Sequence, residues 1–149
     1  MIAFSHIGIC VSDLAKAKRF YCDGLGFKET IAYKIGNEAA PIMEITDDMV
    51  LNSVMIRKDG INIELLDFES PKVQRAEGRR SMTLTGLTHL SLLVDDVDAV
   101  AAQAVACGGI LVKHTRTKMD QGDFVYLTDP DGTRVDLMRL NSGPVPTGE

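Results

Sequence analysis

The chain carries an internal duplication, and this feature constrains its fold more than any other. Residues 5–14, with the sequence SHIGICVSDL, return in similar form at residues 88–97 as THLSLLVDDV. A second pair follows downstream, with DGINIELL at residues 59–66 and DGTRVDLM at residues 131–138. The repeat is far longer than a solenoid period, so the sequence predicts two related modules.

Hydrophobic alternation and turn signals predict the same order of elements in both halves. Each half is expected to form a strand, a helix and three further strands, which makes the fold class α+β. In the first half these elements span residues 2–11, 12–24, 27–34, 49–57 and 61–67. In the second half they span residues 87–94, 95–109, 110–115, 123–127 and 133–140. We therefore expect one structural domain with a first module over 1–67, a linker over 68–85, a second module over 86–140 and a tail over 141–149.

Composition narrows the class of partner. The 149 residues carry a formal net charge of -5, which argues against nucleic acid because phosphate binding needs a basic surface. No apolar window is long enough to span a membrane, and the N-terminus does not read as a signal peptide. Three cysteines without CxxC spacing are expected to be reduced, Cys22 and Cys107 as small buried residues near helix ends. These features predict a cytoplasmic protein that handles small molecules.

Each half carries one histidine and one carboxylate at matching positions, both within strands. Alternation places Glu64 on a strand face with Asn62 and Leu66, and Asp136 on a face with Arg134 and Met138. Together with His6 and His89, these acids would form a site with two nitrogen and two oxygen ligands, suited to Zn, Ni, Co, Mn or Fe(II).

The alternative interpretation is that the histidines are hydrogen-bonded within their strands and that the acids are solvated or paired with arginines. A charged residue inside an aliphatic strand is costly unless it is paired or ligated, and the matched placement in both halves favours a metal site. The remaining histidine, His114, has no counterpart in the first half and is expected to lie on the surface.

Over residues 2–140 the chain resembles the vicinal oxygen chelate superfamily, which includes glyoxalase I, methylmalonyl-CoA epimerase, extradiol dioxygenases and the fosfomycin and bleomycin resistance proteins. The motifs that carry the resemblance include SHI and VSDL at residues 5–14, IELL at 63–66 and DPDG before VDL at 129–137. The resemblance implies two β-α-β-β-β modules that close a cup-shaped mixed sheet around a divalent metal. It places the family ligands on His6, Glu64, His89 and Asp136, and it implies a homodimer.

Two positions depart from members of this family. The fourth ligand is usually glutamate, whereas Asp136 is shorter by one carbon–carbon bond, about 1.5 Å. The residues that hold glutathione in glyoxalase I are an arginine and an asparagine, and their places are taken here by Cys10 and Phe68. The resemblance is therefore closer to the epimerase-like and lyase-like branches.

These features predict a metal-dependent lyase or isomerase that moves a proton next to a carbonyl of a small oxygen-chelating substrate. Glu64 and Asp136 are the candidate catalytic acid–base residues. Two alternatives stay open: an extradiol-type Fe(II) dioxygenase, and a non-catalytic binding or resistance protein. The candidate substrate-binding residues, among which Arg134 has a surface ion pair as its alternative role, are Phe4, Cys10, Asn62, Leu66, Ser91, Arg134 and Met138.

Overall fold

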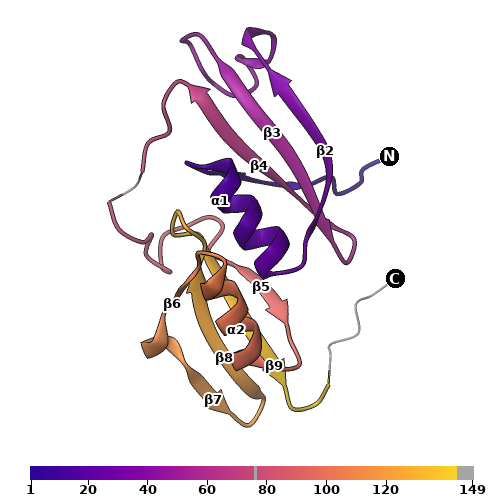
Figure 1. The fold of residues 1–149 in the computed structure, drawn as a ribbon, viewed down its shortest axis with the longest axis vertical. Coiled ribbons are helices and arrows are strands. Elements are labelled where there is room, and N and C mark those ends of the chain that lie inside the picture. The colour runs from indigo at the N-terminus through magenta and orange to yellow at the C-terminus, as the bar shows by residue number, and fades with distance from the viewer. Residues whose placement is uncertain (76, 144–149) are drawn as a thin grey trace. The chain divides into compact units, whose positions relative to one another are not determined.

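The computed structural model describes residues 1–75 and 77–143, and it contains two compact units that divide after Arg75. We call the unit up to Arg75 module one and the following unit module two. Each has a strand, a helix and an antiparallel set of strands in the predicted order (Figure 1). The predicted α+β class with two β-α-β-β-β modules is confirmed.

Module one contains a four-stranded sheet in the order β1-β4-β3-β2. β1 is parallel to β4, and the other two pairs are antiparallel. Its elements are β1 (Ile7–Cys10), α1 (Leu14–Lys18), a π-helical turn (Arg19–Gly24), β2 (Lys28–Ile35), a 3-10 turn (Asn37–Ala39), β3 (Val50–Lys58) and β4 (Ile61–Ser70).

Local sequence explains the two sharpest features of module one. The Asp13 side chain accepts a hydrogen bond from the Lys16 backbone N–H and so caps α1. Asp59 and Gly60 both have positive φ, +48° and +81°, which is the backbone of a tight two-residue hairpin between β3 and β4.

The α1 helix packs on one face of the module-one sheet. Lys18 of α1 pairs with Glu29 of β2 at 2.5 Å, and Glu29 lies opposite Ile56 in the sheet register. Ile63 and Leu65 of β4 are buried on this same face. The aliphatic side of the strands therefore faces the helix, and the other side, which carries Glu64, does not.

Residues 36–49 cover one end of the face that carries Glu64. Ala40 and Met49 form a buried cluster with Leu51 of β3, and Leu66 and Phe68 of β4 pack against it. We call this stretch the cover segment. Met43 and Met49 contribute to its packing.

Module two contains a five-stranded sheet in which β5-β9-β8-β6 form the main path and β7 pairs with β8. β5 is parallel to β9. Its elements are β5 (Leu90–Leu93), α2 (Val97–Ala106), β6 (Ile110–Leu111), a 3-10 turn (Lys113–Thr115), β7 (Thr117–Met119), β8 (Gly122–Thr128) and β9 (Arg134–Leu140).

Several predicted strand limits are wrong. The strand expected over residues 110–115 ends at Leu111, because the Thr115 hydroxyl donates to the Val112 carbonyl and closes a 3-10 turn. The first strand begins at Ile7 rather than at residue 2, and β4 continues to Ser70 rather than ending at residue 67. The short β7 was not expected.

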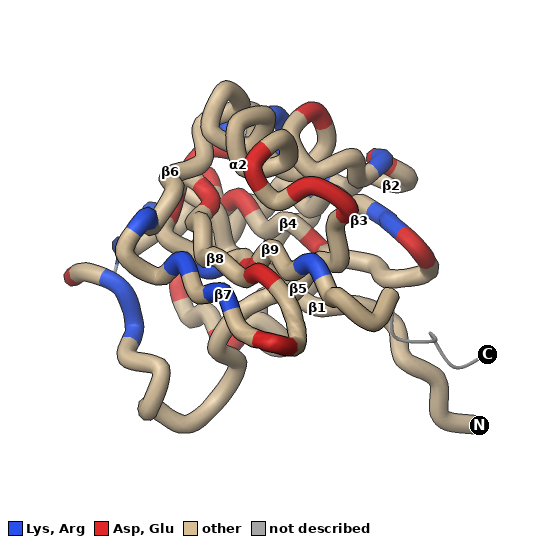
Figure 2. Tube along the Cα trace, turned by 90° about the horizontal axis from the view of Figure 1, so that it is seen from below, with Lys and Arg blue, Asp and Glu red and all other residues tan. Residues whose placement is uncertain are grey.

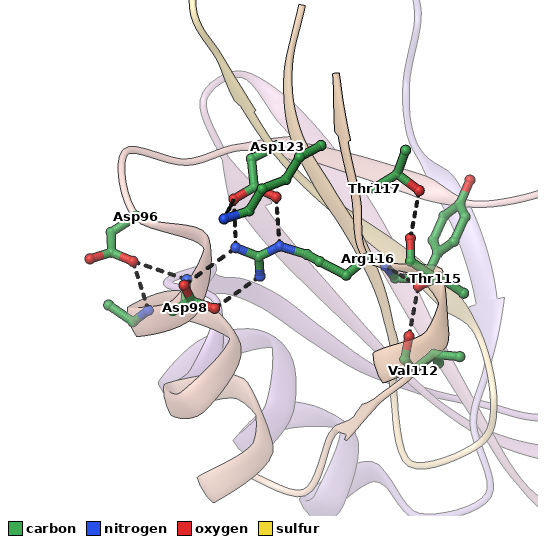
Figure 3. Close-up of polar contacts among 10 residues, drawn as sticks. Asp96, Asp98, Val112, Thr115, Arg116, Thr117 and Asp123 are labelled. Carbon is green, nitrogen blue, oxygen red and sulfur yellow. Dashed lines mark hydrogen bonds and ion pairs between the residues drawn. The ribbon is translucent and has the colours of Figure 1, made fainter. Parts of the chain in front are cut away.

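An arginine network ties the turn after β6 to the helix side of module two (Figure 3). Arg116 donates from Nε and Nη2 to the two carboxylate oxygens of Asp123, each at 2.5 Å, and from Nη1 to Asp98 of α2 at 2.9 Å. The Arg116 guanidinium lowers the pKa of the Asp123 carboxyl. The charge of the buried Asp123 is therefore compensated by Arg116, which lies outside the strand β8.

Lys and Arg residues are interspersed with Asp and Glu along the chain (Figure 2). In residues 1–75 and 77–143, no helix is long and apolar enough to cross a membrane. Cys22 and Cys107 are half-buried rather than fully buried, and Cys10 is exposed.

Candidate functional site

The strand register of module one brings its predicted site residues onto one face. Gly8 of β1 lies opposite Glu64 of β4, so His6, two residues before Gly8, lies on the same side of the sheet as Glu64. Met55 of β3 flanks Glu64 on the other side. The predicted alternation of β4 is confirmed.

His6 and Glu64 are in direct contact. The His6 Nε2 atom lies 3.1 Å from Glu64 Oε2, and their side chains are 36% and 15% exposed. The other carboxylate oxygen, Oε1, accepts a hydrogen bond of 2.5 Å from the Ser53 hydroxyl on β3. The Ser5 hydroxyl lies 2.9 Å from His6 Nδ1, which leaves Nε2 as the ring nitrogen directed at the carboxylate.

Module two places its histidine and carboxylate on a corresponding face. Ser91 of β5 lies opposite Asp136 of β9, and its hydroxyl donates to Asp136 Oδ2 at 3.1 Å. The Thr88 hydroxyl lies 2.9 Å from His89 Nδ1, which repeats the arrangement of Ser5 and His6. Burial raises the pKa of the Asp136 carboxyl, while the Ser91 hydrogen bond and the charge of His89 oppose this rise.

Tyr126 joins the module-two group and was not predicted from the sequence. It lies opposite Asp136 in the register of β8 and β9, and its ring meets the His89 ring edge-on at a centroid distance of 5.4 Å. Its hydroxyl lies 3.5 Å from His89 Nδ1. Burial and the nearby Asp136 charge raise the pKa of the Tyr126 hydroxyl.

Other residues that sequence analysis missed are the hydroxyl groups beside the ligands. Ser5 and Thr88 stand at matching positions of the repeat, so the duplication itself contained a signal for them. Ser53 gave a weaker signal, as one polar residue within a largely apolar strand.

Two predicted substrate-binding residues make structural hydrogen bonds. The Asn62 amide donates to the Ser5 carbonyl at 2.9 Å and so holds the chain next to His6. Arg134 donates from its guanidinium to the Arg80 carbonyl. Asn62 thus positions the histidine segment, and Arg134 has a partner within its own module.

The remaining predicted residues differ in exposure. Phe4 is 71% exposed and Cys10 is exposed, whereas Leu66 and Met138 are half-buried on the same faces as Glu64 and Asp136. His114 is exposed in the 3-10 turn after β6, as expected. Leu66 and Met138, rather than Phe4, therefore provide apolar side chains next to the two carboxylates.

The donors of module one suit a divalent metal ion. Two ligand atoms, each about 2.0–2.2 Å from one ion, lie roughly 3 Å apart in tetrahedral or octahedral coordination. The 3.1 Å separation of His6 Nε2 and Glu64 Oε2 agrees with that value, and both side chains have hydroxyl partners of the kind that orient metal ligands. Among the residues that the structure describes, no group of three or more His, Cys, Asp or Glu side chains is arranged to hold a metal ion.

Comparisons with known proteins identify relatives along nearly the whole chain. The family model described as the Glyoxalase/Bleomycin resistance protein/Dioxygenase superfamily matches residues 3–137. The chain is 33% identical over 136 residues to the uncharacterized protein YaeR of Escherichia coli strain K12, covering 89% of this chain and 92% of that protein.

Two solved structures show the similarity of fold. A glyoxalase family protein from Bacillus cereus aligns with a TM-score of 0.80 at 17% identity, over 94% of this chain and 95% of that one. The fosfomycin resistance protein FosX from Listeria monocytogenes aligns with a TM-score of 0.62 at 20% identity, over 93% of this chain and 94% of that one.

Proposed function

Because the chain belongs to the glyoxalase/bleomycin resistance protein/dioxygenase superfamily, we propose that it is a divalent-metal-dependent lyase or isomerase. Its reaction is the transfer of a proton next to a carbonyl of a small substrate that chelates through two oxygens. His6, Glu64, His89 and Asp136 are its proposed metal ligands. We also propose that the protein is a homodimer.

The contact between His6 and Glu64 is the observation that carries this proposal. An imidazole and a carboxylate meet at 3.1 Å on the face of the sheet away from the helix, and each has a hydroxyl partner. Such outer partners fix the orientation of metal ligands and are part of the design of metal sites. A surface ion pair does not require hydroxyl partners on both of its side chains.

The residues of the chain have distinct tasks in this proposal. When bound, a divalent ion supplies Lewis-acid stabilisation of negative charge on a carbonyl oxygen. One carboxylate, Glu64 or Asp136, released from the ion or adjacent to it, takes the proton from carbon as general base and returns it as general acid. Leu66 and Met138 lie on the same faces as these carboxylates and provide apolar contacts for the substrate.

A solvent deuterium exchange screen tests this function. The purified protein is loaded with Zn, Ni, Co, Mn or Fe(II) in turn and incubated in D2O with α-hydroxy-carbonyl and acyl-CoA compounds. We expect metal-dependent exchange at a carbon-bound position of one compound, and we expect His6→Ala and Glu64→Ala to abolish it.

The same preparation distinguishes the alternatives. Oxygen consumption with catechol-like compounds only after Fe(II) loading would indicate a dioxygenase. Ligand affinity without metal-dependent turnover would indicate a binding protein. Exchange that survives both substitutions would count against the assigned ligands.

A further inference from the structure

We infer that Ser53 is a positioning residue that makes Glu64 a one-oxygen metal ligand. This inference rests on the proposed function and concerns the same site. The Ser53 hydroxyl holds Oε1 of the carboxylate, so that Oε2 alone is directed at the histidine side.

The contact geometry supports this role. The Ser53 Oγ to Glu64 Oε1 distance is 2.5 Å, within the short range typical of a hydroxyl that donates to a charged carboxylate. Ser53 is 1% exposed, so its hydroxyl is shielded from bulk solvent, and in the structure Glu64 is its acceptor. A buried donor fixed in this way orients the plane of the carboxylate and stabilises its negative charge.

The consequence concerns how many ligand positions the protein uses. A carboxylate can bind a metal through one oxygen or through both. With Oε1 occupied by Ser53, Glu64 contributes one donor atom, and more positions around the ion remain for the two oxygens of a chelating substrate. Loss of the hydroxyl would let the carboxylate rotate and bind through both oxygens.

Module two offers a way to restore the missing donor. Ser91, the counterpart of Gly8 in the repeat, donates to Asp136 from the strand parallel to it. A Cβ atom at Gly8 would meet only Leu66 Cδ1, at 3.5 Å, which is an ordinary contact. Gly8→Ser should therefore place a second hydroxyl beside Glu64 without disturbing the strand.

Titration with Co(II) tests the inference in four variants of the full chain: Ser53→Ala, Ser53→Thr, the double variant Ser53→Ala/Gly8→Ser, and Ser70→Ala. Ser70 is the matched control because its hydroxyl donates to the Asp48 carbonyl, away from Glu64. Affinity and the visible absorption of bound Co(II), which depends on its coordination, are measured together with the thermal midpoint of each variant.

We expect Ser53→Ala to weaken Co(II) binding about 10- to 100-fold and to change the absorption spectrum. At least one of the two variants that retain or replace the hydroxyl should recover both, and Ser70→Ala should match the wild type. Wild-type affinity and spectrum in Ser53→Ala would overturn the role of Ser53 while leaving the proposed function intact. If Ser53→Ala does not fold, a double variant with an unaltered melting temperature and no recovery of affinity overturns the inference. A wild-type protein that binds no divalent metal would overturn the proposed function itself.

Discussion

In module one, Glu64 receives its hydroxyl from Ser53 on the antiparallel neighbour β3, whereas in module two Asp136 receives one from Ser91 on the parallel neighbour β5. Glu64 also touches its histidine at 3.1 Å, while in the described part of the chain no ion pair joins His89 and Asp136. Tyr126 approaches His89 instead, from the register position that Met55 occupies in module one. Both modules therefore hold a histidine and an acid on one face. In the described residues, the two are in direct contact only in module one, and we call His6 and Glu64 the contacting pair.

This difference follows from side-chain length and from which strand provides the hydroxyl. Glutamate contacts Ser53 on one neighbouring strand and His6 beside the other, whereas aspartate, shorter by one carbon–carbon bond, contacts Ser91 on one neighbouring strand. Burial raises the pKa of the Asp136 carboxyl, and the Ser91 hydrogen bond and the His89 charge offset only part of that rise. The two carboxylates of the repeat therefore differ in their hydrogen-bond partners and in their contact with histidine, which suits different roles for them.

The largest expected effect on stability comes from adding a side chain at a strand glycine, and each module has one such glycine for comparison. A Cβ at Gly122 of β8 would collide with the Arg139 carbonyl of β9, whereas a Cβ at Gly8 fits. We expect Gly122→Ala to lower the free energy of unfolding by about 3 kcal/mol through overpacking, and Gly8→Ala to change it by less than about 1 kcal/mol. Urea denaturation measures both, and equal effects would show that the two strand pairs tolerate a side chain alike.

Removing the charge of each carboxylate tests whether the contacting pair of module one contributes more to metal affinity than Asp136 of module two. We expect Glu64→Gln to weaken Zn or Co(II) binding by more than about 100-fold, beyond the range typical of outer-shell changes. Asp136→Asn should cost about 10-fold, because this acid is not paired with its histidine in advance. Calorimetric titration at one pH gives both values, and the reverse order would make module two the principal binding half.

The Arg116 network predicts a pH-dependent difference on the helix side of module two. Asp123→Asn should cost about 2 kcal/mol near neutral pH, because it removes charge-assisted hydrogen bonds. The pKa of Asp123 is lowered in the fold, so this stabilisation is complete above the ordinary carboxyl pKa of about 3.9 and is lost as the pH falls through the folded value.

Denaturation curves of wild type and variant should therefore converge under acidic conditions. Glu69→Gln in module one is the control, since the Glu69–Lys34 pair is exposed and should contribute less. A difference that persists at low pH would assign the effect to packing.

The smallest expected effect belongs to Tyr126. Its hydroxyl is 3.5 Å from His89 Nδ1, beyond the usual hydrogen-bond range, and Thr88 already contacts that nitrogen. Tyr126→Phe should change metal affinity by less than about threefold, well below Ser53→Ala. A larger loss in titration would show that module two depends on a hydroxyl in the way that module one does.

Sequence reasoning succeeded where the signal was local. Period-two alternation in β4 placed Glu64 opposite the aliphatic residues correctly, and turn signals gave the correct order of elements in both halves. It failed at residues 110–115, where the apolar run looked like a strand. There the Thr115 hydroxyl closes a turn with the Val112 carbonyl, and the Arg116 network with Asp98 and Asp123 holds that turn against other elements of module two.

The candidate site shows the same division. His6 and Glu64 were found because the repeat marks them, and their contact confirms that they lie together. Ser53 and Tyr126 were missed because each acts through a neighbour in another strand, and strand pairing is not encoded in the period of either one. The full set of four ligands stays a prediction.

The cover segment makes the surroundings of Glu64 unequal on its two sides. Ala40 and Met49 lie over Leu51, with Leu66 and Phe68 packed beside them, so apolar groups close off the sheet next to Glu64 on that flank. The Glu64 side chain is 15% exposed and the His6 side chain that it contacts is 36% exposed, so the acid has an apolar cluster on one side and an exposed imidazole on the other. We therefore expect Glu64 to exchange protons with solvent mainly on the side of His6.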